Sequence, residues 1–188
     1  AVTDNGNMFG AVEFYYAAKK AGIKPILGMD VYVAPKSRLV KGTDPEVQNL
    51  PFRRLVLLAK NYQGYQNLCQ ISSIGYQEGF YYKPRVDHEV LEKYNEHLIA
   101  LSGGIQGEIA HLFLEKGEAE ALARIRFYKN IYGDNFYLEI CRTGLSAWSE
   151  LIAFYQRVSQ SEGVQLVASN DVHYLEPDDQ LSQEVLIC

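Results

Sequence analysis

The sequence has few of the features that would mark a secreted or membrane-spanning protein. It contains only three cysteines, Cys69, Cys141 and Cys188, and no run of about 18 apolar residues that could cross a membrane. Because the cysteines are odd in number and lack CxxC spacing, they indicate reduced thiols rather than a disulfide framework or a zinc knuckle. No signal-peptide pattern opens the chain. We therefore expect a cytoplasmic protein without membrane contact.

Basic residues are also in the minority. The chain has 23 acidic and 18 basic residues and a net charge of −5. Surfaces that bind nucleic acid are usually basic, so this balance argues against the chain being a main nucleic-acid contact, although it allows a local basic patch. Lys19, Lys20 and Lys24 form one small basic cluster, most simply explained as the solvated end of a helix.

The apolar content is sufficient for one folded domain. Hydrophobic residues make up 47% of the 188 residues, and a chain of this length buries roughly 70% of its unfolded surface. We predict a single domain over residues 1–188. Because residues 1–2 read as the end of a strand and residues 185–188 lie within an apolar helical pattern, we expect this domain to be a fragment of a longer polypeptide, truncated at both ends.

Strand-like and helix-like segments alternate along the chain. Helical spacing of apolar residues predicts helices at 8–21, 64–76, 86–94, 107–114, 118–132 and 146–161. Short apolar runs predict strands at 25–33, 55–59, 97–101, 136–141 and 164–168, and residues 34–52 read as a long mobile loop. This alternation predicts an α/β fold built on a parallel sheet, and a (β/α) barrel fits it.

Most of the predicted strands carry candidate site positions or end at them. These are Asp4 and Asn5 after the first, incomplete strand, Asp30 within the second, and, after later strands, Gly103 and Gly104, Arg142 and Thr143, and Asp171 and His173. In a parallel barrel the carboxyl ends of the strands meet at one mouth, where active sites are built. Asp171 and His173 offer a carboxylate oxygen and an imidazole nitrogen, both competent metal ligands.

Four segments occur in an order that resembles a known family. They are residues 3–10 (TDNGNMFG), 22–33 (GIKPILGMDVYV), 101–104 (LSGG) and 169–175 (SNDVHYL). Together they resemble the PHP (polymerase and histidinol phosphatase) domain found in alpha subunits of bacterial DNA polymerase III. The resemblance covers essentially the whole chain and implies a distorted, seven-stranded TIM-like (β/α)7 barrel of the PHP type.

The resemblance also implies a metal site, and this chain departs from its pattern. Active relatives hold a cluster of metal ions at the barrel mouth, but Asn5, Gly104 and Thr143 stand where metal-binding side chains are usual. Asp30, Asp171 and His173 remain as metal ligands. Three ligands could hold a single divalent ion (zinc, manganese or magnesium) at low occupancy, but not a cluster. We therefore expect a degenerate site with no catalytic residues and no required cofactor.

Two functions follow from this resemblance. The first is a non-catalytic domain of a replicative DNA polymerase chain (a nucleotidyltransferase) that serves as scaffold and docks a separate proofreading exonuclease subunit. Its partners would be the rest of the alpha chain and that subunit, with DNA bound only through the parent polymerase. The alternative is an active metal-dependent phosphoesterase or 3′–5′ exonuclease, and a generic α/β barrel is a third reading.

Other segments have both a functional and a structural reading. Residues 79–85 (GFYYKPR) could stack bases, but we interpret them as aromatic cover with Lys83 and Arg85 in solvent. Helix 146–161 and loop 34–52 are candidate docking elements, the former through Trp148 and Tyr155, which serve equally well as core residues. The histidines at 88, 97 and 111 are expected to be surface or packed side chains, and Cys141 is expected to be a structural thiol.

Overall fold

The computed structural model describes residues 1–41, 52–141, 147–170 and 172–187 of the chain. The strands are β1 (Val2–Asn5), β2 (Leu27–Val33), β3 (Arg53–Ala59), β4 (Phe80–Tyr81), β5 (Lys83–Val86), β6 (Leu98–Leu101), β7 (Phe136–Ile140) and β8 (Gln165–Ala168). The α-helices are α1 (Ala11–Lys20), α2 (Tyr62–Gln77), α3 (His88–Lys93), α4 (Glu108–Lys116), α5 (Glu118–Tyr132), α6 (Ala147–Glu162) and α7 (Gln180–Ile187). Every strand and helix predicted from apolar spacing is present, with ends shifted by a few residues. None of these described helices is both long and apolar enough to span a membrane.

The strands form one mixed sheet rather than the predicted parallel one. Its order is β4-β5-β2-β3-β6-β7-β8, and β1 pairs with β2 in parallel. Strand β3 runs antiparallel to both of its neighbours, β2 and β6, whereas β6, β7 and β8 run parallel. The short β4 is antiparallel to β5. The prediction of an all-parallel sheet is therefore wrong, because the connection from β2 to β3 contains no helix in its described part and lets the chain return antiparallel.

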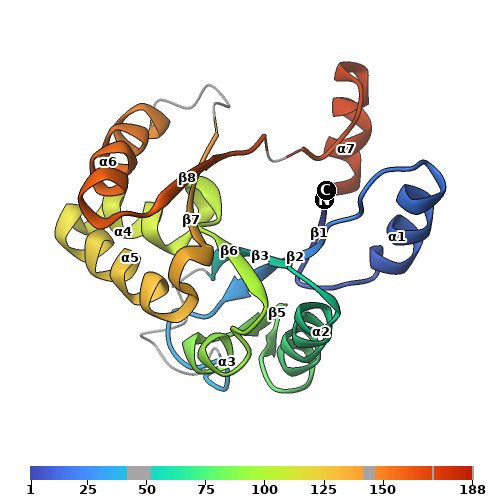
Figure 1. Ribbon diagram of the computed structural model, residues 1–188, viewed down its shortest axis with the longest axis horizontal. Coiled ribbons are helices and arrows are strands. Elements are labelled where there is room, and N and C mark those ends of the chain that lie inside the picture. Colours follow the sequence, from blue (N-terminus) through green and yellow to red (C-terminus); the bar gives the residue numbers. More distant parts are fainter. Residues whose placement is uncertain (42–51, 142–146, 171, 188) are drawn as a thin grey trace.

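The sheet does not close into a barrel over the described strands. At one end β8 pairs with β7, and near the other end β1 pairs with the first half of β2. The second half of β2 pairs on the same side with β5. Helices surround the strands, with α1, α2 and α3 along one part of the circumference and α4, α5 and α6 along another (Figure 1). The TIM-like barrel is thus confirmed only as far as an α/β sheet with helices around it.

Side-chain caps define where several helices begin. The Asn61 side chain accepts a hydrogen bond from the Gly64 amide at 3.0 Å and begins α2. Asp87 begins α3 by accepting from the Val90 amide at 3.3 Å. Because the first amides of a helix lack intrahelical acceptors, such caps stabilise a helix by about 1 kcal/mol each.

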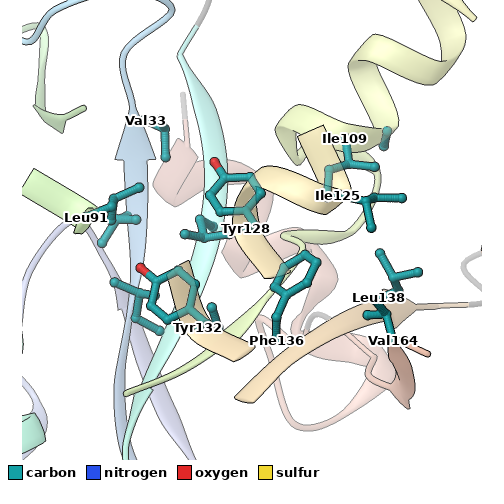
Figure 2. Close-up of a cluster of buried hydrophobic side chains, with 14 of the residues drawn as sticks. Val33, Leu91, Ile109, Ile125, Tyr128, Tyr132, Phe136, Leu138 and Val164 are labelled. Atoms are coloured by element: carbon teal, nitrogen blue, oxygen red, sulfur yellow. The ribbon is translucent and has the colours of Figure 1, made fainter. Parts of the chain in front are cut away.

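The core lies between the sheet and helices α2 to α6. Figure 2 shows Tyr128 and Phe136 at its centre, and their rings stack with centroids 5.5 Å apart. Ile125 and Leu138 are fully buried beside them. Trp148 and Tyr155 of α6 are 5% and 0% exposed, so they are core residues and do not supply a docking surface.

A buried polar group sits at the edge of this core. The Glu108 carboxylate accepts a hydrogen bond from the Tyr128 hydroxyl at 2.7 Å and lies 3.0 Å from His88 Nε2 and 3.3 Å from Arg124. Burial alone would raise the pKa of Glu108, but the hydrogen bond from His88 and the charges of His88 and Arg124 outweigh it and hold the pKa below its usual value. His88 is therefore a packed structural histidine, as predicted.

The described part of loop 34–52 is held by ion pairs, while residues 42–51 lie outside the described residues. Arg38 binds the buried Asp87 at 3.0 Å and Glu78 at 2.7 Å. Arg85 donates to the carbonyl oxygens of Gly79 and Val40, at 3.1 and 2.9 Å. Arg85 is 4% exposed, so the prediction that it lies in solvent is wrong. Its guanidinium is used to join the β4–β5 hairpin to this loop.

Candidate functional site

A small cavity lies at the mouth that the strand-end residues predict. It has a volume of about 140 Å³, and we call it the mouth cavity. Its polar lining comes from three strands and the segments that follow them. The main polar and reactive side chains are those of Asp30 on β2, Arg54 on β3, Glu139 on β7, and Cys141.

The Arg54 guanidinium contacts both Asp30 of β2 and Asn5 of β1. Its Nε lies 3.1 Å from Asp30 Oδ2, and the two side chains are only 11% and 10% exposed. The same guanidinium donates a hydrogen bond to the side-chain oxygen of Asn5, which pairs with Asp30 across the β1–β2 ladder. A nearly buried cation thus neutralises Asp30 and binds the residue beside it.

The reversed direction of β3 explains how an arginine reaches the mouth. Arg54 stands at the start of β3, and antiparallel pairing places that start beside the later half of β2, where Arg54 is opposite Tyr32. The loop after β6 then passes very close. A side chain at Gly103 would lie 2.2 Å from the Arg54 carbonyl oxygen, and Gly103 has a φ of +79°, so only glycine fits there.

Gly104 lies beside the second carboxylate of the mouth. An added Cβ at this position would be 3.6 Å from the Trp148 ring and 3.9 Å from Glu139 Oε2. Glu139 is 8% exposed, and its backbone amide donates to the Ser102 hydroxyl at 2.9 Å. A metal-binding side chain at position 104 would therefore project toward Glu139, and glycine leaves that place without a donor.

The aromatic neighbour of Arg54 is also affected by the site. Burial raises the pKa of the Tyr32 hydroxyl, while the positive charge of Arg54 acts in the opposite direction. Lys83 lies 5.9 Å from the centre of the Tyr32 ring. Tyr32 therefore remains a neutral phenol that borders a charged pair.

The structure brings together some of the predicted site residues and not others. Asp30 and Gly104 line the mouth cavity, and Asn5 joins them through Arg54. His173 is exposed and is not among the described residues that line the cavity. Thr143 and Asp171 lie outside the described residues, so the predicted roles of Thr143, Asp171 and His173 remain predictions.

The described donors do not fit a metal cluster. Within residues 1–41, 52–141, 147–170 and 172–187, no group of three or more His, Cys, Asp or Glu side chains is placed to hold a metal ion. The cavity does contain two carboxylates and one thiol, but the Arg54 guanidinium already binds the Asp30 carboxylate. A metal ion beside Asp30 would have to displace this cation or accept its repulsion.

Arg54 and Glu139 are the site residues that the sequence reasoning missed. Glu139 carries a signal, because it is a charged residue inside the apolar strand FYLEI, and buried charges are rare unless paired. Arg54 carries a weaker one. It stands at the start of a strand, whereas the rule used to find site residues considers only positions at the carboxyl ends of strands.

Comparison with known proteins agrees with this architecture. The profile of the PHP domain family matches residues 1–143. The whole chain is 43% identical to a DNA polymerase III subunit alpha of Borreliella burgdorferi, 41% to that of Thermus aquaticus and 40% to that of Deinococcus radiodurans. It spans 16%, 15% and 14% of the lengths of these relatives. With a match over residues 1–143 and a mouth that retains Asp30 at the expected strand, the chain belongs to the PHP domain family.

Proposed function

We propose that this chain is the PHP domain of a replicative DNA polymerase III alpha chain and that the domain itself is not catalytic. The single observation that carries this proposal is the Arg54–Asp30 ion pair inside the mouth cavity. Asp30 is the predicted metal ligand that the structure describes at the site, and its carboxylate is already bound to a cation of the protein.

The chemistry of PHP-type hydrolysis gives the reason. A multi-metal phosphoesterase needs metal ions that polarise the phosphoryl oxygen and activate a water molecule. A guanidinium can neutralise Asp30, but its pKa is far too high to yield a nucleophile, and it has no open coordination position. Asn5 and Gly104 add no anionic ligand. On this proposal the domain serves the polymerase chain as a structural scaffold and catalyses no reaction of its own.

A phosphodiesterase assay tests the first half of this proposal. The purified chain is incubated with bis-p-nitrophenyl phosphate and with a 3′-labelled oligonucleotide, each with Mn²⁺, Zn²⁺ or Mg²⁺. We expect no turnover above that of an Arg54→Met, Asp30→Asn double variant, which lacks both charges of the pair. Turnover in the unaltered chain that the double variant loses would establish the alternative, an active metal-dependent phosphoesterase or exonuclease.

The second half concerns partners. We propose that a separate proofreading exonuclease subunit docks on the outer surface of the domain without needing a metal ion. Helix α6 contributes little through Trp148 and Tyr155, since both are buried, so the contact must use other exposed residues. Titration calorimetry with the exonuclease subunit, with and without a chelator, tests this. Equal affinity is expected, and affinity lost with the chelator would show that a metal site organises the interface.

A further inference from the structure

A second and larger cavity lies between helices α1 and α2, at the opposite end of β3 from Arg54. Its volume is about 520 Å³, and we call it the tyrosine cavity. Helix α1, the start of β2, the end of β3 and the first turn of α2 contribute to it. Its most distinctive lining residues are Tyr15, Tyr16, Lys60, Tyr62 and Tyr65.

The tyrosine rings of this cavity are available for contact. Tyr62 is 73% exposed and Tyr16 is 68% exposed, so neither is a core residue. The Tyr62 and Tyr65 rings lie 6.2 Å apart at an angle of 30°, and the Tyr15 and Tyr16 rings meet edge to face at 5.5 Å. Four rings around one hollow give several flat faces on which planar groups can stack.

One basic residue lines this cavity and two more stand close to its lining residues in the sequence, in contrast to the acidic net charge of the chain. Lys60 lines the cavity, and its contact with Asn135 at 2.9 Å uses one of the three N–H donors of the ammonium group. Lys19 stands four residues after Tyr15 on α1 and therefore shares its face. Lys24 directly precedes Pro25, another lining residue. No acidic side chain is among the described residues that line the cavity.

Helix α2 adds to this positive field. Its 16 residues, YQGYQNLCQISSIGYQ, include no acidic and no basic side chain, so no charged side chain of the helix offsets the partial positive charge of its first amides, of which only that of Gly64 is bound by the Asn61 cap. These amides follow Lys60 and Asn61 at the rim of the cavity. Glu13 is the single acidic residue of α1, and it does not line the cavity.

From these observations we infer that the tyrosine cavity binds a segment of single-stranded nucleic acid, with bases stacked on Tyr16 and Tyr62 and phosphates facing Lys19, Lys24 and Lys60. Aromatic faces beside a basic groove are the chemistry that recognises unpaired nucleotides without sequence preference. The site is separate from the mouth cavity, because Arg54 and Asp30 do not line it. The inference holds whether or not the mouth is catalytic.

Fluorescence anisotropy of a labelled 12-nucleotide oligo-dT with the purified chain at low salt tests the inference. We expect saturable binding that Tyr62→Ala and Tyr16→Ala each weaken by roughly 5- to 150-fold, the effect of losing one stacking face. Tyr62→Phe keeps the ring and should bind as the unaltered chain does. Lys60→Ala should lower the slope of log K against log salt by about 0.7.

Tyr82→Ala is the matched control, since Tyr82 is 80% exposed, lies beside Lys83 and is outside the cavity. It should leave binding unchanged. Circular dichroism confirms that each variant is folded. The inference is overturned if oligo-dT does not bind, if Tyr62→Ala and Tyr16→Ala bind as the unaltered chain does, or if Tyr82→Ala weakens binding equally. Saturation of the cavity by a protein partner, with no oligonucleotide binding, would likewise overturn it.

Discussion

At the scale of single residues, we expect the Arg54–Asp30 pair to contribute measurably to the free energy of unfolding. Replacing Arg54 by Met leaves the Asp30 carboxylate buried without its cation. Removing one partner of a buried pair typically costs about 3–5 kcal/mol, and we expect the lower part of this range because both side chains keep about a tenth of their surface exposed. Urea denaturation of the Arg54→Met variant measures the loss.

Arg157 provides the matched control for this prediction. It pairs with Glu118, and both side chains are 58% exposed. Exposed pairs contribute about 0–1 kcal/mol, so Arg157→Met should change the free energy of unfolding little. Equal losses of unfolding free energy in the two variants would show that the buried Arg54–Asp30 pair contributes no more than an exposed pair.

Mn²⁺ or Zn²⁺ should raise the melting temperature of Arg54→Met more than that of the unaltered chain, because only the variant has lost the competing cation.

Glu108 should make stability depend on pH at the acidic side. Its pKa is held below the usual value of 4.5, so its contribution is complete above about pH 4.5 and is lost as the pH falls through the lower, folded-state pKa. Glu108→Gln should therefore be less stable than the unaltered chain at pH 7, with a difference that shrinks as the pH falls below 4.5. Thermal melts from pH 3 to 7 test this, and a constant difference would contradict it.

At the scale of elements, Asp87 performs two separable tasks. It caps α3 through the Val90 amide, and it binds Arg38 of the loop after β2. Asp87→Asn keeps an oxygen for the cap but loses the ion pair, whereas Asp87→Ala loses both. We expect the Ala variant to be about 1 kcal/mol less stable than the Asn variant, the contribution of one cap.

Denaturant titration of both variants separates these tasks. Protease cleavage after Arg38 or Lys41 should increase in both, because both lose the buried ion pair between Asp87 and Arg38 and leave the loop held by the more exposed pair of Arg38 with Glu78. If the Asn variant were as resistant to cleavage as the unaltered chain, the ion pair would have no role in holding the loop.

The helices and strands also show which features of the fold can be predicted from the local spacing of apolar residues. Apolar spacing predicts the helices and strands well, since periodicity reports which face is buried. It does not predict the direction of β3, because direction depends on which strands become neighbours. It does not predict the β4–β5 hairpin either. The turn of this hairpin places Tyr82 at a φ of +59°, and a tyrosine in the sequence does not indicate such a left-handed turn residue. The strand-end pattern does place Asp30 and Gly104 at one cavity, with Asn5 connected to it through Arg54, while their role as a metal site stays a prediction. It gives no signal for Arg54, because β3 runs in the reverse direction and brings its first residues to the mouth.

At the scale of the whole molecule, the open sheet predicts self-association of this chain. Among the described strands, β8 pairs only with β7, so its other edge presents backbone N–H and C=O groups that can pair with another chain. We expect sedimentation velocity to show dimers that increase with protein concentration. A Lys substitution at Val167 in β8 should reduce them, and a chain that stays monomeric at all concentrations would contradict the prediction.

The Arg54 cation has a consequence for how the domain responds to its surroundings. The occupancy of a bound metal ion follows the free metal concentration, and falls when the supply in a cell falls. A guanidinium is part of the polypeptide, so it is present in every copy and keeps its charge at any physiological pH. A mouth held by such a cation would keep the same shape when metal ions are scarce, whereas a mouth held by bound metal ions would lose them.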